Sequence, residues 1–171
     1  LSDLFRRIAP FSGRKSGRPK NTTMERLLAD IFYLAHNRIE ELGIDVTLPA
    51  SSTPVTLDPS DMQSLFFNLL ENALHWLERV PHGERKIVVD VRSLPAEIQV
   101  IFSDSGPGVD EEIRERIFEP YFSTKPDGVG LGLALAGEIA NEYDGNLDLL
   151  AEGPLDGATF RVTLRHRVGV R

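Results

Sequence analysis

The sequence predicts an α+β fold in two layers, with a mixed and mostly antiparallel sheet covered on one face by helices. Three segments carry apolar residues at helical spacing, and two neighbouring segments alternate apolar and polar residues as the strands of a hairpin do. Helices and strands do not follow a strict β-α-β order, so we expect the helices on one face of the sheet. With 171 residues, 41% of them hydrophobic, the chain has enough apolar material for one globular core.

The expected elements follow from local signals along the chain. Residues 24–42 carry an apolar stripe at helical spacing that ends before a glycine. Residues 58–79 predict the strongest helix, because Asp58 is a suitable N-cap and Pro59 suits the first helical position. A third helical stripe follows a glycine-rich stretch and ends at Gly145. Strands are expected at 44–49, 54–58, 86–92, 97–103, 146–152 and 158–165, the third and fourth forming an antiparallel hairpin.

Composition excludes several kinds of site. The chain has no cysteine, which rules out disulfides and thiolate zinc sites, and its four histidines are too scattered to favour a histidine metal cluster. No apolar run approaches the roughly 20 residues needed to cross a bilayer, and the first residues do not have the order of a signal peptide. We therefore expect an intracellular, cytoplasmic domain. Because the chain begins with Leu1 and not methionine, we expect it to be a fragment of a longer protein.

The first 23 residues differ in charge from the rest. They carry six basic residues and one acidic residue, a local charge of +5, which leaves −12 for the remainder of a chain whose net charge is −7. A basic segment can contact nucleic acid or an anionic membrane. Residues 12–23 are polar, contain glycine and serine, and lack interleaved aromatics, so we favour a solvated linker and expect no nucleic-acid partner. Residues 1–11 resemble the last turns of a helix that stops near Pro10.

A polar face is expected on the helix at residues 58–79. Asn68, Asn72, His75 and Trp76 recur at spacings of three and four and so share one side, opposite a strongly apolar side. Asparagine is a mediocre helix former, so a polar ligand would explain the pair, although an exposed polar stripe is the simpler interpretation. Asn72 could offer its amide oxygen to Mg²⁺, His75 could donate to a phosphate, and Trp76 could stack on a base or ribose.

Two glycine clusters follow the predicted hairpin. In "DSGPG", Asp104 ends a buried strand, and Gly106 and Gly108 would let a flat ligand approach the backbone closely. A buried carboxylate there could accept a hydrogen bond from the exocyclic amine of adenine, which guanine does not offer at that position. The alternative is an ordinary tight turn. In "GVGLGLALA" a loop becomes a helix, so free backbone N–H groups would face an anion such as phosphate. It lacks the ending of a P-loop and does not directly follow a strand.

The stretch "IFEPYFSTKPD" separates the two clusters. Phe118 and Phe122 could anchor a loop that carries Ser123, Thr124 and Lys125, and Lys125 could reach a terminal phosphate as part of a lid. The alternative is a hydrophobic pin for a loop without a ligand.

Together these motifs resemble the catalytic ATP-binding domain of sensor histidine kinases, in the superfamily shared with DNA gyrase, heat-shock chaperone ATPases and mismatch-repair ATPases. "NLLENALHW" resembles the asparagine box, "DSGPGV" the first glycine box, "IFEPYFSTK" the phenylalanine box and lid, and "GVGLGLALA" the second glycine box. The resemblance covers about residues 24–166 and implies the Bergerat ATP-binding fold.

The resemblance implies a role for each matching residue. It places ATP against Asn72, Trp76, Asp104, Gly106, Gly108, Val109, Phe118, Phe122, Ser123, Thr124, Gly128, Val129, Gly130, Leu131, Gly132 and Leu133, with Asn72 as the Mg²⁺ ligand and Asn68, His75 and Lys125 as catalytic groups. At the position of Asn68 the ATPase branches carry a glutamate that activates water, which an amide cannot do. Val129 and Ala134 replace hydroxyl residues that are frequent in the second glycine box, which could weaken phosphate binding.

The resemblance also implies an activity and partners. Residues 24–168 would be the catalytic domain, and residues 1–23 the end of a dimerisation helix with a basic linker. The domain would transfer the γ-phosphoryl group of ATP to a histidine of the missing dimerisation domain, because none of the four histidines of this chain has the expected acceptor context. The phosphoryl group would then pass to a response regulator. The full-length protein would be a homodimer, and it would reach a membrane only through regions missing from this chain. The alternatives are a serine kinase of the anti-sigma type and a nucleotide-binding module without transfer activity.

Overall fold

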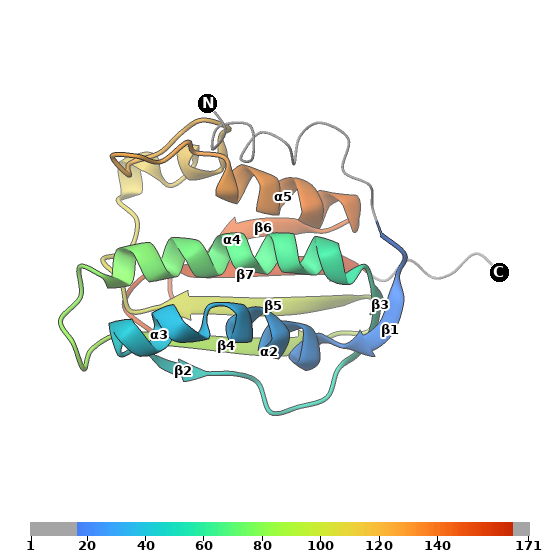
Figure 1. Ribbon diagram of the computed structural model, residues 1–171. Helices are drawn as coiled ribbons and strands as arrows, with labels where there is room; N and C mark the ends of the chain where they lie inside the picture. Colours follow the sequence, from blue (N-terminus) through green and yellow to red (C-terminus); the bar gives the residue numbers. More distant parts are fainter. Residues whose placement is uncertain (1–16, 166–171) are drawn as a thin grey trace.

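The computed structural model describes residues 17–165 and confirms the two-layer α+β fold. Helices cover one face of a five-stranded sheet whose strand order is β2-β4-β5-β7-β6 (Figure 1). The elements are β1 (Lys20–Thr23), α2 (Met24–Leu34), α3 (His36–Leu42), β2 (Asp45–Thr47), β3 (Pro54–Leu57), α4 (Pro59–Leu77), β4 (Lys86–Ser93), β5 (Glu97–Asp104), η2 (Glu111–Ile113), η3 (Arg116–Phe118), α5 (Gly132–Glu142), β6 (Asn146–Leu149) and β7 (Thr159–Arg165).

The sheet is mixed, as expected. Strand β2 pairs in parallel with β4, whereas the β4–β5, β5–β7 and β6–β7 pairs are antiparallel. The central strand β5 pairs Val100 with Val91 on one side and with Val162 on the other. Alternate residues of β4, such as Ile87 and Val89, are buried beneath the helices. The predicted hairpin at 86–92 and 97–103 is therefore confirmed.

Helix α4 crosses the middle of the sheet and supplies much of the core (Figure 1). It begins as the sequence predicts, with Pro59 in the first helical position and the Asp58 side chain accepting a hydrogen bond from the Ser60 backbone N–H at 2.9 Å. Its apolar side includes Leu65, Phe66 and Leu69, none more than 1% exposed. Burial of that side fixes which face of α4 remains for a ligand.

The single helix expected at residues 24–42 is wrong, because the structure has two helices there. The chain turns at Ala35, which has φ −101° and ψ 8°, and whose N–H bonds to the Phe32 carbonyl three residues earlier. Helix α2 buries its apolar stripe, whereas α3 buries only Ile39 and carries Arg38 toward α4. The apolar stripe continues through the turn, so sequence periodicity alone does not reveal the break.

Residues 20–23, which the sequence assigned to the linker, form strand β1. It pairs antiparallel with β3 in a separate two-stranded sheet, with Thr22 opposite Val55. The Thr23 side chain then caps α2 by accepting a hydrogen bond from the Arg26 N–H at 3.2 Å. The polar sequence of this strand hides it, because its stability comes from pairing and capping more than from burial. The helix end expected at residues 1–11 lies outside the described residues.

The connection from β5 to α5 contains only two short 3₁₀ turns, η2 and η3. None of residues 105–130 is buried. Among residues 17–165 no helix is both long and apolar enough to span a membrane.

Candidate functional site

A cavity of about 1170 Å³ lies between α4, the residues after β5 and the beginning of α5. It brings together segments that are far apart in the sequence. The predicted site residues that line it are Asn68, Asn72, His75, Trp76, Gly108, Val109, Phe122, Ser123, Thr124, Lys125, Gly128, Val129, Gly130, Leu131, Gly132 and Leu133. Three predicted residues, Asp104, Gly106 and Phe118, do not line it directly.

Asp104 lies buried at the end of β5, beside the cavity. Asp104 is only 2% exposed, and its side chain accepts a hydrogen bond from the Gly106 N–H at 2.8 Å. Burial raises the pKa of Asp104 to about 6, against the opposing effect of the hydrogen bonds from the Gly106 and Ala158 backbones. When ionised, this buried carboxylate can accept a further hydrogen bond from a ligand.

Two glycines pack closely against this carboxyl. A Cβ atom at Gly106 would lie 2.7 Å from Asp104 Oδ1 and 3.4 Å from Trp76 Cβ. Gly157, in the turn before β7, is packed against the same group, because a Cβ there would lie 2.7 Å from Asp104 Oδ1 and would collide with the Asp104 backbone. The sequence analysis missed Gly157. Its only sequence signal was a glycine in a turn, and its closeness to Asp104 depends on the pairing of β5 with β7.

The polar face of α4 faces the cavity as predicted. Asn68 Nδ2 donates a hydrogen bond to the Ser64 carbonyl at 2.7 Å, and Asn68 Oδ1 lies 3.0 Å from where a Cβ of Gly132 would be. The ring of His75 meets that of Trp76 edge-on, with 4.9 Å between centroids. The Arg79 guanidinium lies over the Trp76 ring, 4.7 Å from its centroid.

His75 has a buried nitrogen without a partner. Among the described residues, no group hydrogen-bonds its Nε2 atom, although that atom is shielded from solvent. Burial, followed by the nearby positive charge of Lys125, lowers the pKa of His75 from its ordinary 6.5. An unpartnered buried nitrogen costs free energy that an acceptor in the cavity would recover.

The lid segment, residues 121–130, is a loop closed at its base by a hydrogen bond from the Tyr121 N–H to the Gly130 carbonyl at 2.8 Å. Gly130 has φ +74°, and a Cβ there would collide with the Phe122 backbone, so only glycine fits. Within the loop, the Ser123 hydroxyl accepts a hydrogen bond from the Lys125 N–H at 3.1 Å. Lys125 is partly buried, and the resulting loss of solvation of its ammonium group lowers its pKa.

Phe118 anchors this region to the sheet and does not line the cavity. Its ring meets Phe160 of β7 edge-on, at 6.3 Å between centroids. Phe122 lies in the cavity wall, with the Arg116 guanidinium 4.4 Å from its ring centroid.

Helix α5 begins at the cavity with Gly132. Its N-cap, Leu131, makes no side-chain capping hydrogen bond. The N–H groups of the first helical turn have no partner within a helix, and together they present partial positive charge to the cavity.

An ion-pair network links α3 to the C-terminal part of α4 and to the residue that follows it. Arg38 donates hydrogen bonds to Glu71 at 3.0 Å and to Glu78 at 2.8 Å, and the bond to Glu78 is the main reason that the pKa of Arg38 is raised. Arg38 and Glu71 both line the cavity. The sequence analysis missed both residues. The positions of Glu71 on α4 and Glu78 directly after it were visible in the sequence, but the approach of α3 was not.

Comparison with known proteins identifies similar chains. The family described as "Histidine kinase-, DNA gyrase B-, and HSP90-like ATPase" matches residues 57–168. The nitrogen regulation protein NtrY of Azorhizobium caulinodans is 30% identical over 171 residues, an alignment that covers 96% of this chain and 22% of that protein. The chain also spans less than a third of seven further curated relatives, six of them named as sensor proteins or sensor histidine kinases and one as the signal transduction histidine-protein kinase AtoS of Escherichia coli.

Two solved structures show the same fold. The catalytic domain of the histidine kinase ThkA aligns with a TM-score of 0.74 and 25% identity, covering 87% of this chain and 96% of that one. The histidine kinase ThkA in complex with the response regulator protein TrrA aligns with a TM-score of 0.76 and 22% identity, covering 96% of this chain and 47% of that one.

Proposed function

Because this chain belongs to the family of histidine kinase-, DNA gyrase B- and HSP90-like ATPases, as the ATP-binding catalytic domain of a sensor histidine kinase, we propose that its cavity holds ATP with Mg²⁺ and presents the γ-phosphate to a histidine of another domain. One observation carries the proposal. A single cavity contains the uncapped beginning of α5, the unpartnered Nε2 of His75 and the desolvated ammonium group of Lys125. All three favour an anion, as the phosphates of a nucleotide would provide.

The opposite end of the site fits adenine. The Asp104 carboxylate would accept a hydrogen bond from the exocyclic amine, while Gly106 lets the base approach beside Trp76. Guanine would present a carbonyl oxygen to the same carboxylate and leave a buried acceptor unpaired, at a cost of roughly 1–3 kcal/mol. This geometry supports ATP in preference to GTP.

Asn72 fits the role of a magnesium ligand. It lies in the cavity wall one helical turn after Asn68, and its amide oxygen is the type of hard donor that Mg²⁺ accepts. Magnesium held by phosphates typically takes one or two protein ligands, so a single asparagine is sufficient. When bound, Mg²⁺ would supply charge neutralisation at the transferring phosphoryl group.

The residues of this chain position the phosphates more than they react with them. His75 and Lys125 would donate hydrogen bonds to phosphate oxygens, and the first turn of α5 would hold the chain of phosphates in place. Asn68 already donates to the Ser64 carbonyl and, as an amide, cannot take a proton from water. Glu71, a carboxylate on the same wall, is hydrogen-bonded to Arg38. The site therefore favours transfer of the phosphoryl group over hydrolysis.

We infer that the acceptor is a histidine of the dimerisation domain of the longer protein, which passes the phosphoryl group to a response regulator. The names of the relatives support this inference, as does the ThkA structure with its regulator. They do not favour the anti-sigma serine kinase or the module without transfer activity. We further propose that the longer protein is a homodimer, that this domain is cytoplasmic, and that any membrane contact lies elsewhere in that protein.

The decisive test is transfer of label from γ-labelled ATP to the histidine-bearing hairpin of the longer protein, mixed with this chain. We expect label that is labile in acid and stable in base, and loss of that label in Asn72→Ala. Acid-stable label would indicate serine and overturn the proposal, as would an absence of label despite ATP binding. Asn68→Glu separately tests whether the site favours phosphoryl transfer over hydrolysis. It should raise ATP hydrolysis by about tenfold or more, whereas Asn68→Gln should not.

A further inference from the structure

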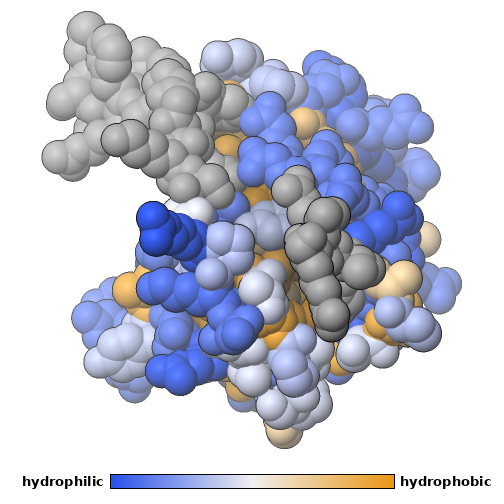
Figure 2. Space-filling view, turned by 90° about the vertical axis from the view of Figure 1, so that its right-hand side faces the viewer, coloured by the Kyte–Doolittle hydropathy of each residue, from blue (hydrophilic) through white to orange (hydrophobic). Residues whose placement is uncertain are grey.

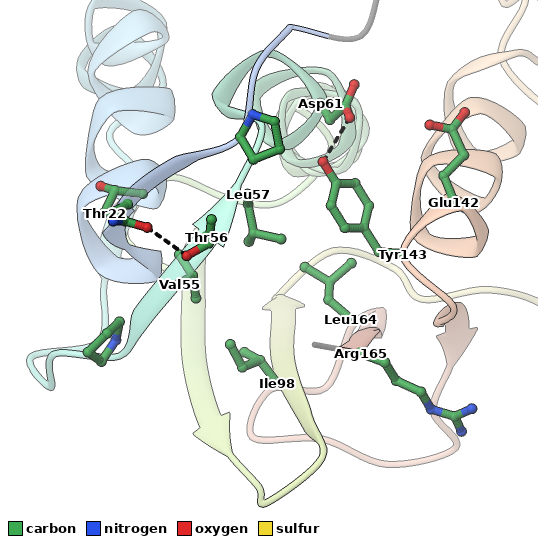
Figure 3. Close-up of a pocket in the computed structure, with 13 residues that line it drawn as sticks. Thr22, Val55, Thr56, Leu57, Asp61, Ile98, Glu142, Tyr143, Leu164 and Arg165 are labelled. Atoms are coloured by element: carbon green, nitrogen blue, oxygen red, sulfur yellow. Dashed lines mark hydrogen bonds between the residues drawn. The ribbon is translucent and has the colours of Figure 1, made fainter. Parts of the chain in front are cut away.

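A second cavity, about 640 Å³, lies on the opposite side of the molecule from the start of α5. It is a groove between the β1–β3 pair, the end of α5, the start of β5 and the end of β7. Val55, Leu57, Ile98 and Leu164 point into it (Figure 3). Figure 2 views the molecule from the side that carries β1 and β3, and apolar surface is visible there between hydrophilic residues. We call this cavity the β1–β3 groove.

The groove has an acidic side. Asp61 and Glu142 line it, and the Tyr143 hydroxyl donates a hydrogen bond to Asp61 Oδ2 at 2.8 Å (Figure 3). The basic residue in the lining, Arg165, lies 3.5 Å from Glu97 in an ion pair. An occupant with apolar side chains would suit the apolar part of this lining.

The first described residues, which precede β1, lie beside this groove. Pro19 forms part of the lining, and a Cβ at Gly17 would lie 2.9 Å from Asp58 Oδ2, so the backbone before β1 runs along the acidic side. The residues before Gly17 contain five large apolar side chains, at positions 1, 4, 5, 8 and 11, of which 1, 4, 8 and 11 recur at helical spacing. Residues 1–16 also carry four basic side chains and one acidic one.

We propose that the β1–β3 groove is the docking site for residues 4–11 of the same chain. Leu4, Phe5, Ile8 and Phe11 would supply the apolar side chains for the groove. Only the polar residues 12–16 separate this run from Gly17, a tether of about 12 Å root-mean-square length for a flexible chain. A tether that short gives an effective concentration on the order of millimolar, which favours the chain's own segment over a second copy.

The segment after Arg165 is a weaker occupant. Residues 166–171 contain only two apolar side chains, both valine, whereas residues 4–11 offer two phenylalanines and two branched aliphatic residues. Docking of residues 4–11 would set the orientation of whatever precedes the catalytic domain relative to α5 and the sheet. The inference does not depend on the proposed function, because the groove shares no lining residue with the nucleotide cavity.

The test uses the full 171-residue chain and methyl NMR signals of Val55, Leu57, Ile98 and Leu164. The variant Phe5→Ser/Ile8→Ser should shift these signals and lower the melting temperature by about 2–4 °C. The matched control is Arg14→Ser/Lys15→Ser, two substitutions in the same segment outside residues 4–11. It should leave the signals and the melting temperature nearly unchanged. Equal shifts in the two variants would overturn the proposal.

A groove variant provides an independent check. Thr56 is exposed and lines the groove, so Thr56→Arg should exclude the segment without disturbing the core. Thr56→Arg also removes the hydrogen bond from the Thr56 hydroxyl to Asn21, so its effect on melting temperature should be less than additive with that of Phe5→Ser/Ile8→Ser, because the two variants share only the docking contact. Full additivity would contradict docking, and groove signals that shift on dilution of the wild-type chain would assign the groove to a second copy. ATP-induced shifts of Leu131 and Leu133 should persist in every variant, which separates this outcome from a failure of the proposed function.

Discussion

Helix α4 and residues 105–131 form facing walls of the nucleotide cavity, but they are held in place by different means. Nine of the 19 residues of α4 are buried, and its first turn is capped by Asp58. None of residues 105–130 is buried, and that segment depends on glycine conformations, short 3₁₀ turns and a few backbone hydrogen bonds. The core therefore fixes one wall, whereas the other can rearrange at a low cost in stability. We therefore expect the residues that recognise the nucleotide on the fixed wall, and the residues that close over it on the adjustable wall.

The largest effect should come from Asp104, which ends a core strand and so belongs to the fixed side. Asp104→Asn places an amide where adenine needs an acceptor alone, and we expect ATP affinity to fall about 10- to 100-fold. Isothermal titration calorimetry measures this change. Asp110→Asn is the matched control, because Asp110 is an exposed carboxylate that lines the same cavity. Similar losses in the two variants would place adenine elsewhere.

The same substitution has a consequence for stability that depends on pH. The folded pKa of Asp104, about 6, lies above its ordinary 3.8, so the folded state binds the proton more tightly than the unfolded state. Stability from this group is fully present below about pH 4 and is lost as pH rises through 6. Asp104→Asn lacks this titration and should gain stability relative to the wild type between pH 4 and 7. Melting temperatures across that range test the sign, and a constant difference would contradict the raised pKa.

An intermediate effect is expected in the adjustable wall. Gly130→Ala forces a left-handed conformation on alanine against the Phe122 backbone, and we expect about tenfold weaker ATP binding. The melting temperature should change little, because the lid segment adds no buried residue to the core. In contrast, Leu69→Ala in α4 should cost about 2–5 kcal/mol of unfolding free energy.

Gly137→Ala is the glycine control for that experiment. Gly137 lies within α5, and a methyl group there would meet no neighbouring element within 4 Å, so alanine should stabilise the helix by roughly 0.5–1 kcal/mol. Thermal unfolding and ATP titration of both variants complete the comparison. A fall in melting temperature for Gly130→Ala as large as that for Leu69→Ala would show that the two walls do not differ in the way described.

The smallest effect concerns the point where the two walls meet. His75 of α4 has a lowered pKa, to which Lys125 of the lid segment contributes after burial. Phosphate oxygens accepting from Nε2 would favour the protonated ring, so ATP should raise the pKa of His75. NMR titration of the imidazole protons measures it, with His36 and His82 outside the cavity as internal references. An unchanged His75 titration on ATP binding would remove it from the phosphate site.

The same contrast explains what could be predicted from sequence. Helix α4 was predictable because Asp58, Pro59 and its apolar periodicity all act within one segment. The lid residues were recognisable as motifs, but the hydrogen bond that closes the loop from Tyr121 to Gly130 was not. Gly157 could not be assigned, because its importance arises from the register of β7 beside β5.

Strand β1 and the break at Ala35 show a second limit. The residues of β1 are polar, and β1 is stabilised by a partner more than 30 residues away, so no local pattern indicates it. At Ala35 neither glycine nor proline marks the end of α2. The direction of α3 is instead associated with the contact of Arg38 with Glu71 and Glu78, a tertiary interaction.

Helices α4 and α5 frame the nucleotide cavity, and the Tyr143 hydroxyl links them at the ends that lie far from that cavity. It donates to Asp61 in the first turn of α4 and accepts from the Asp58 N–H at 3.3 Å, while Tyr143 itself follows the last turn of α5. These hydrogen bonds hold one end of α4, whose 19 residues span about 28 Å. A tilt of about 5° at the pinned end would displace the His75 end by roughly 2 Å over that length. A small disturbance beside the β1–β3 groove would thus be geometrically amplified where the phosphates bind.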